Sequence, residues 1–281
     1  MNQKISVVIP TLGGIHLEQT IKNLNNGTKI PNEIILSLPK KTYTILKLSK
    51  YTNVKIIKTF RKGQVHQRIE GFKSAKYPLV LQLDDDILLN KYCLRELSNF
   101  LRFKKKVSVS PLLITKSKSS NFDRRPKNLF YKIYHFFLNG KENFKEGQVS
   151  KAGIPYYFDN YKKNNIYKTD WLSGGCILHK KENLILKNYF FIKSKKAYCE
   201  DLIHSHKLKK KKIQLYLNTN AKAKYDDFDG FKLSSLKDFY AIIKSDYMCR
   251  LYYVKLSKKS IVRMNLYYFF LIIRFFFTKI K

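Results

Sequence analysis

Short apolar runs alternate with amphipathic stretches from the start of the chain to about residue 90. The runs are rich in Val, Ile and Leu and too short for ordinary helices, which is typical of buried strands. We expect strands at residues 5–9, 33–38, 54–57 and 78–83, and helices between them at 15–26, 41–50 and 64–76. Strands and helices that alternate in this way predict an α/β fold with an open, Rossmann-like, mostly parallel sheet flanked by helices.

The second third of the chain is less regular. A helix is expected at 91–103, with leucines on one side, and a strand at 107–114. Residues 115–168 are basic and rich in Tyr, Phe and Asn, and only a helix at 128–138 is predicted there. We expect this stretch to be an excursion over the edge of the sheet that carries the functional site.

The composition permits one sizeable α/β domain with an appendage. The chain has 281 residues, of which 44% are hydrophobic and 15% aromatic, enough for a real core. The formal net charge of +36 favours anionic partners such as nucleic acid, anionic lipid headgroups or phosphorylated substrates. The charge also follows from a general excess of Lys alongside Asn, Ile, Phe and Tyr, so alone it selects none of these partners.

The cysteines and the start of the chain bear on the compartment. The four cysteines, at positions 93, 176, 199 and 249, form no CxxC pair and predict neither a zinc site nor a disulfide framework. The first strand begins at residue 5, and no basic, apolar and small-residue signal sequence precedes it. We therefore expect a cytosolic location.

Three adjacent carboxylates, Asp84, Asp85 and Asp86, end the fourth expected strand. Such a group beside a core is costly unless a cation neutralises it. Side chains two apart on an extended chain point the same way, so Asp84 and Asp86 can converge on one divalent ion. Hard oxygen ligands suit Mg²⁺ or Mn²⁺. A solvated acidic loop or a helix N-terminus is the alternative interpretation.

Pro10 and Thr11 follow the first strand directly. In open α/β sheets, ligands bind beyond the carboxyl ends of the strands. Asp84–Asp86 stands at the same edge of the predicted sheet. This geometry places the two motifs in one site.

Two further motifs occur later in the chain. Gly174 and Gly175 separate Trp171 from a short apolar strand, where the backbone either bends or approaches another group closely. Taken alone, the glycines are better explained by an ordinary tight turn. Glu200 and Asp201 stand at the head of an expected helix, either as caps that compensate its dipole or with one carboxylate acting as a base.

Together, these motifs resemble those of the family 2 glycosyltransferases, nucleotide-sugar-dependent enzymes with the GT-A fold. The resemblance covers about residues 4–228. Four motifs in the same order make it fairly specific. They are Val7–Thr11, Asp84–Asp86, Trp171–Gly175 and Glu200–Asp201.

The resemblance implies a site for a nucleotide-sugar donor. Pro10 and Thr11 would line the nucleotide pocket. Arg68, in the helix before the acidic strand end, matches a basic position that the family often keeps near the nucleotide. A glycine loop would contact donor sugar and acceptor. The residues of this loop are Trp171, Gly174 and Gly175.

The resemblance also implies roles for the acids. Asp84 and Asp85 would contact the donor, and Asp84 with Asp86 would form a DxD-type site that holds a divalent cation, Mg²⁺ or Mn²⁺, on the donor diphosphate. Asp201 would be the catalytic base, with Glu200 beside it. An acid at a helix N-terminus stays ionised at neutral pH and can take the acceptor proton.

The sequence departs from the family at three points. Residues 37–39 read Ser-Leu-Pro where an acid usually reads the uracil, which leaves the nucleotide base open. Asp226 or Asp227 stands near the position where a His often adds a metal contact, and we expect Asp226 to do so. The QxxRW signature of processive synthases and their membrane spans are absent, which favours addition of a single sugar.

The last fifty residues form a basic, aromatic-rich tail. We divide the chain into a catalytic domain, residues 1–230, and a helical, amphipathic tail, residues 231–281. The tail's apolar run from Leu266 to Phe277 falls short of the ~20 residues that span a bilayer. A cationic aromatic helix fits the anionic cytoplasmic face of a membrane; packing on the catalytic domain is the alternative.

The resulting hypothesis is an inverting glycosyltransferase of surface-polysaccharide or glycolipid synthesis, peripheral at the cytoplasmic face of the membrane. Its acceptor would be a saccharide or a lipid-linked one. A non-catalytic protein that binds nucleic acid or anionic membrane is the first alternative, since basic, aromatic chains bind single strands. No RNA-binding signature is found, so no nucleic acid partner is expected. A nucleotidyltransferase ranks lower, because Gly13-Gly14 has no neighbouring lysine.

Overall fold

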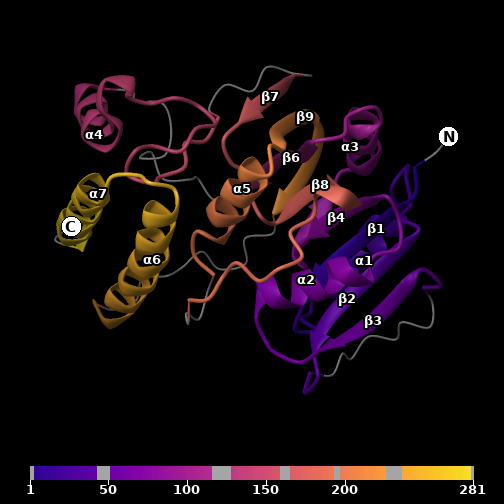
Figure 1. The fold of residues 1–281 in the computed structure, drawn as a ribbon. Helices are drawn as coiled ribbons and strands as arrows, with labels where there is room; N and C mark the ends of the chain where they lie inside the picture. Colours follow the sequence, from indigo (N-terminus) through magenta and orange to yellow (C-terminus); the bar gives the residue numbers. More distant parts are fainter. Residues whose placement is uncertain are drawn as a thin grey trace.

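The computed structural model describes residues 3–42, 51–115, 128–158, 165–192, 197–225 and 236–279. Within these residues, nine strands form one sheet in the order β3-β2-β1-β4-β8-β6-β9-β5, with β7 paired to β9. Helices lie on both sides of the sheet, and the two C-terminal helices lie at the end of the molecule away from β3 (Figure 1). The chain therefore has the expected α/β architecture of a central sheet flanked by helices.

The secondary structure begins and ends close to the predicted residues in the first 115 positions. The strands are β1 (Ile5–Pro10), β2 (Glu33–Pro39), β3 (Val54–Thr59), β4 (Leu79–Leu83), β5 (Ile87–Leu89), β6 (Val107–Thr115), β7 (Ile166–Thr169), β8 (Cys176–Lys180) and β9 (Gln214–Tyr225). The helices are α1 (Leu17–Asn25), α2 (Gln64–Ser74), α3 (Cys93–Leu101), α4 (Leu129–Asn139), α5 (Glu200–Lys210), α6 (Leu236–Leu256) and α7 (Ile261–Lys279), with short 3₁₀ turns at Gly140–Glu142 and Lys181–Asn183. A further helix was predicted at 41–50, but residues 43–50 of it lie outside the described residues.

The first four strands of the sheet order, β3-β2-β1-β4, are all parallel. Their side chains alternate between two layers of core. Val7 and Ile9 pack with α1 and α3 on one face, whereas Val8 packs with Phe72 of α2 on the other. Both faces are thus buried, which explains why these strands are continuous apolar runs rather than alternating ones.

Beyond β4 the sheet is mixed. β8 runs antiparallel to both β4 and β6, β9 is parallel to β6, and β5 and β7 pair antiparallel with β9. The expectation of a mostly parallel sheet therefore describes the half that ends at β4. In β6 the register against β9 shifts between Pro111 and Leu112. Pro111 lacks a backbone donor, so this irregularity stands where a proline interrupts the ladder.

The stretch at 115–168 contains more structure than its sequence predicted. The expected helix is present as α4, and β7 ends at Thr169. Between them, residues 140–158 fold into a compact segment held by a β-bridge between Val149 and Pro155. The excursion thus supplies a strand to the edge of β9 and, as shown below, part of a cavity wall.

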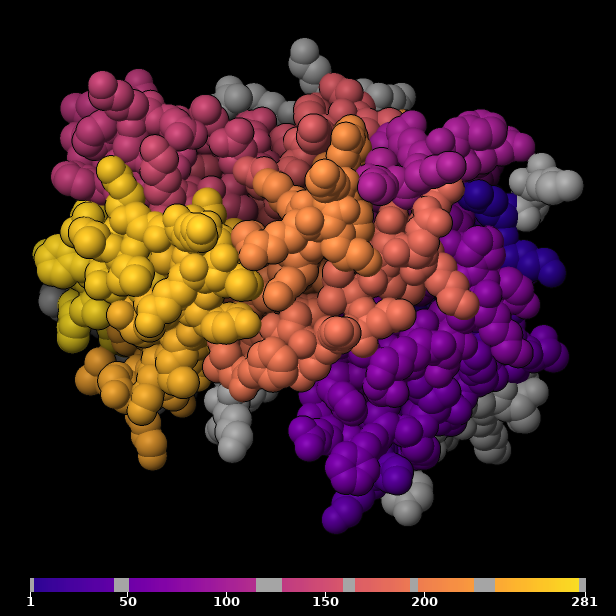
Figure 2. Space-filling model, viewed as in Figure 1, coloured from indigo at the N-terminus to yellow at the C-terminus, as the bar shows by residue number. Residues whose placement is uncertain are grey.

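The C-terminal tail packs on the rest of the chain. Tyr253 and Val254 of α6 and Met264 and Tyr268 of α7 share a buried apolar cluster with α2, α5 and Trp171. Figure 2 shows the yellow C-terminal helices in contact with the middle of the chain. Among the described residues, no helix is both long enough and apolar enough to cross a membrane.

A buried polar cluster joins the two tail helices to each other and to the segment around Gly153. The guanidinium of Arg250 donates to the carboxylate of Asp246 at 2.9 Å and to the carbonyl of Gly153 at 2.8 Å. The Tyr268 hydroxyl of α7 donates to Asp246 at 2.5 Å. Because each buried charge has its partner, this cluster specifies how α6 and α7 dock.

Candidate active site

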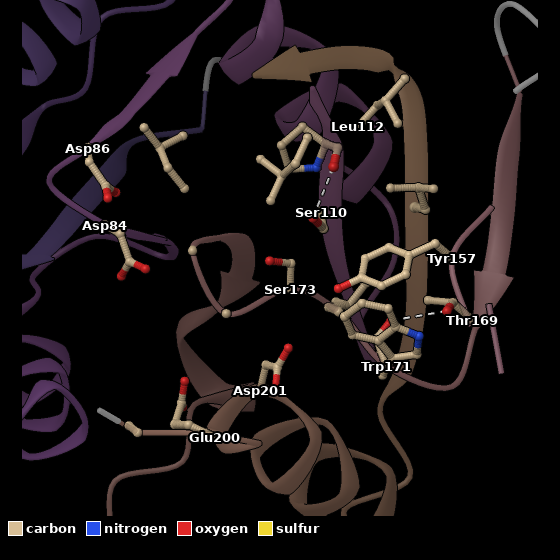
Figure 3. Close-up of a pocket in the computed structure, with 18 of the residues that line it drawn as sticks. Asp84, Asp86, Ser110, Leu112, Tyr157, Thr169, Trp171, Ser173, Glu200 and Asp201 are labelled. Carbon is tan, nitrogen blue, oxygen red and sulfur yellow. Dashed lines mark hydrogen bonds between the residues drawn. The ribbon is translucent and has the colours of Figure 1, made fainter. Parts of the chain in front are cut away.

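One cavity of about 810 Å³ lies beyond the carboxyl ends of β1 and β4, a volume in the usual range for ligand sites. Its walls come from three parts of the chain: the acidic loop after β4, the glycine loop with the head of α5, and β6 with the 156–158 segment (Figure 3). The lining residues are Pro10, Gln64, Asp84, Asp85, Asp86, Ile87, Ser110, Pro111, Leu112, Leu113, Tyr156, Tyr157, Phe158, Thr169, Trp171, Leu172, Ser173, Gly174, Gly175, Ala197, Glu200, Asp201 and Leu217.

Asp84 is fixed where β4 ends. Its backbone N–H donates to the carbonyl of Gly175 at 2.8 Å, and its carboxylate accepts from Gln64 at 3.0 Å and from Arg68 at 3.4 Å. Burial raises the pKa of Asp84 to about 6; the Arg68 charge opposes this rise, and the charge of Asp86 adds to it. The carboxylate is therefore held in a position where a further cation would stabilise its charged form.

Asp85 connects the acidic loop to the first strand and helix. Its carboxylate accepts from the Thr11 hydroxyl, and its carbonyl accepts from the Thr20 hydroxyl at 2.8 Å. Figure 3 shows Asp84 and Asp86 on the same wall of the cavity. The outer two acids thus face one space and the middle one is bonded to Thr11, but the backbone is not extended as expected: Asp85 and Asp86 lie in a turn between β4 and β5.

The acidic pair fits a divalent cation in its donor chemistry. Asp84 and Asp86 offer only hard oxygen atoms, and burial raises the pKa of Asp84 even though Arg68 lies beside it. Among the described positions, no cluster of three or more acid, His or Cys side chains is arranged around a common point. Asp226, the expected third ligand, lies outside the described residues. A cation on two carboxylates would complete its shell with waters and donor phosphates.

The glycine pair packs against both groups of acids. A Cβ atom on Gly174 would lie 2.9 Å from an oxygen of Glu200, and one on Gly175 would lie 2.5 Å from Ile87 and 3.3 Å from Asp84. The Gln82 amide also donates to the Gly174 carbonyl. Both glycines lie in a turn, and the same turn brings their backbone close to the side chains of Glu200, Ile87 and Asp84, so both interpretations of this motif apply.

Glu200 and Asp201 begin α5 and have different surroundings. Glu200 is buried, accepts from Arg68 at 2.7 Å, and accepts from the Tyr189 hydroxyl. Asp201 is only partly buried and accepts from the Leu202 N–H at 2.9 Å. Its carboxyl points into the cavity (Figure 3). Burial, together with the charge of Glu200, raises the pKa of Asp201 to about 7.

Arg68 and Thr11, which we expected at the nucleotide, lie behind the cavity wall. Arg68 is fully buried and bridges Glu200 and Asp84. Thr11 is buried beneath Pro10 and bonded to Asp85. Neither contributes to the lining. The other expected residues within the described part of the chain, nine in all, do line it: Pro10, Asp84, Asp85, Asp86, Trp171, Gly174, Gly175, Glu200 and Asp201.

The wall opposite the acids is aromatic, and only Trp171 of its residues was predicted. The ring of Tyr157 meets Trp171 edge-on at 5.0 Å, and Tyr156 lies beside it. The adjacent tyrosines were the only signal in the sequence for the rest of this wall. Gln64 was also missed, although it begins the helix that carries Arg68. The cavity thus has a charged side and an apolar side, with Asp201 between them (Figure 3).

The end of β2, where the family usually has an acid, carries Ser37. Its carbonyl accepts from the Gln67 amide at 2.7 Å and from the Thr11 N–H at 3.2 Å. Gln67 also donates to the carbonyl of Thr11 at 2.8 Å. This cross-link joins the ends of β1 and β2, so the region that would face a nucleotide base is shaped by amide and backbone groups rather than by a carboxylate.

Solved structures with similar folds are glycosyltransferases. GalNAc-T7 with UDP, GalNAc and Mn²⁺ superposes with a TM-score of 0.54 at 14% identity, covering 86% of this chain and 48% of that one. Residues 1–349 of TarS from S. aureus with UDP-GlcNAc give 0.51 at 19% identity, covering 86% and 64%. This chain therefore spans about half to two-thirds of their length. A comparison with the sequences of curated proteins finds no match.

The sequence itself matches a family model over residues 6–164, more than half of the chain. That region contains β1, the acidic loop after β4 and α2 with Arg68. The glycine loop and the head of α5 follow after residue 164 and line the same cavity. On the sequence match and the fold together, the chain belongs to glycosyl transferase family 2.

Proposed function

We propose that the protein transfers a single sugar, with inversion, from a nucleotide-sugar donor to a hydroxyl group of an acceptor. The observation that carries this proposal is the cavity itself, in which Asp201 faces the acidic pair Asp84 and Asp86 across an open space. Inverting transfer needs a base on one side of the reacting carbon and charge neutralisation for the leaving group on the other. No protein nucleophile is required.

In the proposed reaction, the acceptor oxygen forms a bond to the anomeric carbon while the bond from that carbon to the diphosphate oxygen breaks. Asp201 takes the acceptor proton, and the nucleoside diphosphate leaves. A divalent cation held by Asp84 and Asp86 would neutralise the diphosphate. The Mn²⁺ in the GalNAc-T7 structure supports this assignment. The raised pKa of Asp201, about 7, suits a base that must accept a proton near neutral pH.

The donor and acceptor sides follow from the two walls of the cavity. UDP and UDP-GlcNAc in the two neighbouring structures support binding of a nucleoside diphosphate at the acidic side of the cavity. The Tyr157 and Trp171 rings offer apolar faces on the other side, which suits a saccharide or a lipid-linked saccharide. We infer that the enzyme serves surface-polysaccharide or glycolipid synthesis at the cytoplasmic face of a membrane.

A thermal-shift screen of UDP-, GDP-, dTDP- and CMP-linked sugars, with and without Mn²⁺, tests the donor half of the proposal. A ligand that binds only the native state raises Tm. We expect one nucleotide to give a Mn²⁺-dependent shift that Asp86→Ala abolishes and that Glu182→Ala, an exposed acid outside the cavity, keeps. A folded wild type that responds to none of these donors would contradict it.

A further inference from the structure

Helix α4 has an apolar stripe on its exposed side. Five large hydrophobic side chains recur one turn apart and are between 42% and 71% exposed. Tyr134 and Leu138 on the opposite side are buried in the protein. The helix is therefore apolar on both sides, whereas an ordinary surface helix is polar on its exposed side. The stripe consists of Leu129, Phe130, Ile133, Phe136 and Phe137.

Helix α7 carries a second stripe. Phe269, Ile272 and Phe276 follow each other at helical spacing and are between 40% and 57% exposed. The inward side of the same helix, with Met264 and Tyr268, belongs to a buried cluster. The helix is therefore fixed in the protein by one side and presents phenylalanines on the other.

The two stripes adjoin. The guanidinium of Arg263, on α7, donates to the carbonyls of Phe136 and Phe137 at the end of α4, at 3.0 and 2.5 Å. The rings of Phe137 and Phe269 each lie 6.1 Å from the ring of Phe270, which joins the two stripes. Figure 1 shows α4 and α7 at the same end of the molecule. An exposed apolar surface that spans two elements is a mark of an interaction site.

The charge of this surface selects its partner. Neither α4 nor α7 contains an Asp or a Glu, whereas exposed Lys132 and Arg274 flank the stripes. A second copy of the chain would bring Lys132 against a surface whose two helices carry no acid to pair with it. Phenylalanines beside lysine and arginine fit the interface of a bilayer, where the rings enter the acyl boundary and the cations meet anionic headgroups.

We propose that α4 and α7 together form a docking surface for a membrane that contains anionic lipids. The inner side of α4 is packed against the cavity wall: the ring of buried His135 lies 5.1 Å from that of Tyr156, and Tyr156 lines the cavity. Docking through α4 therefore brings the aromatic wall next to the lipid surface. That consequence rests on the proposed function, because it presents a lipid-linked acceptor to the wall beside Asp201.

Co-sedimentation of the full chain with vesicles tests the surface without any donor. The probes are phosphatidylcholine vesicles and vesicles of phosphatidylcholine with an equal part of phosphatidylglycerol. The variant is Phe130→Asp/Phe269→Asp, in which both changed side chains are exposed. Phe103→Asp is the matched control, because Phe103 is 87% exposed beside a run of lysines and lies after α3.

We expect the wild type and Phe103→Asp to bind the anionic vesicles equally, and the double variant to bind at least about tenfold more weakly, since one buried Phe contributes roughly that factor. Equal binding by the double variant, or none by the wild type, would overturn the proposal. A wild-type dimer that the double variant abolishes would also overturn it and assign the surface to a second copy. The donor-induced rise in Tm, measured on the double variant, tests donor binding separately. If the double variant keeps this rise, a negative vesicle result counts against the docking surface and not against the proposed function.

Discussion

Asp201→Asn and Glu200→Gln separate the two adjacent acids at the head of α5. Each change removes one charge and nearly preserves shape. Glu200 is buried and bonded to Arg68 and Tyr189, whereas Asp201 points into the cavity. We therefore expect Asp201→Asn to reduce kcat while preserving the fold. The main effect of Glu200→Gln should instead be a loss of stability of the fold.

The magnitudes follow from these surroundings. A positioned base contributes about 10²–10⁴-fold, so kcat of Asp201→Asn should fall within that range. Among the described residues, Glu200→Gln leaves the buried Arg68 with Asp84, at 3.4 Å, as its remaining ionic partner. Breaking such a pair costs about 3 kcal/mol, which corresponds to a fall in Tm of roughly 6–12 °C in a chain of this size.

The raised pKa of Asp201 also predicts the sign of the change in folding stability that Asp201→Asn causes. The pKa of Asp201 rises on folding from 3.8 to about 7, so the stability contributed by its protonated form is complete below pH 3.8 and is lost as the pH rises through 7. Above pH 7 the folded chain therefore holds an unfavourable charge. Asn carries no charge, so the Tm of Asp201→Asn at pH 8 should equal or exceed that of the wild type.

Two measurements on the same preparations check this: steady-state turnover, followed by release of nucleoside diphosphate, and Tm at pH 8. The expected pattern is a loss of kcat without loss of Tm at 201, and a loss of Tm at 200. The reverse pattern, in which Glu200→Gln keeps its Tm and loses turnover while Asp201→Asn stays active, would refute the assignment of the base.

Three further outcomes follow from the same site. The log of kcat/KM should fall by about one per pH unit below the pKa of Asp201, near 7, and a profile flat to pH 5 would exclude it as the base. Gly175→Ala should cost about 1–3 kcal/mol in urea unfolding, whereas Gly14→Ala, with nothing within 4 Å of its Cβ, should not. Arg68→Met combined with Glu200→Gln should destabilise by less than the sum of the two, and additive losses would show that the pair is not coupled.

The parallel half of the fold was predictable because its signals are local. Four apolar runs separated by amphipathic helices leave few ways to bury both faces of a sheet, and the adjacency of β1 and β4 brings Pro10 and Asp84 to one edge. The acidic motif was visible as three adjacent carboxylates after an apolar run, although Asp85 and Asp86 lie in a turn rather than in an extended strand. These parts of the site depend on periodicity and on the rule that parallel strands end at one edge, both of which a sequence displays.

The rest depends on contacts that the sequence does not display. β9 was missed because Asn218, Thr219 and Asn220 interrupt its alternation, and those residues lie where the register against β6 shifts. The rest of the aromatic wall was missed because Tyr157 approaches the site through an irregular segment. Arg68 was expected at the nucleotide, yet its main partner is 132 positions away, a pairing that only the folded chain defines.

Arg68 explains why neighbouring acids can have different tasks. One buried guanidinium bonds both Asp84, just after β4, and Glu200, at the start of α5, so the acidic loop and the head of α5 are fixed to the same side chain of α2. Burial and the neighbouring Glu200 charge raise the pKa of Asp201 to about 7. In the proposed mechanism, the ion pair that holds the two sides of the cavity together therefore also places the charge that tunes the proposed base.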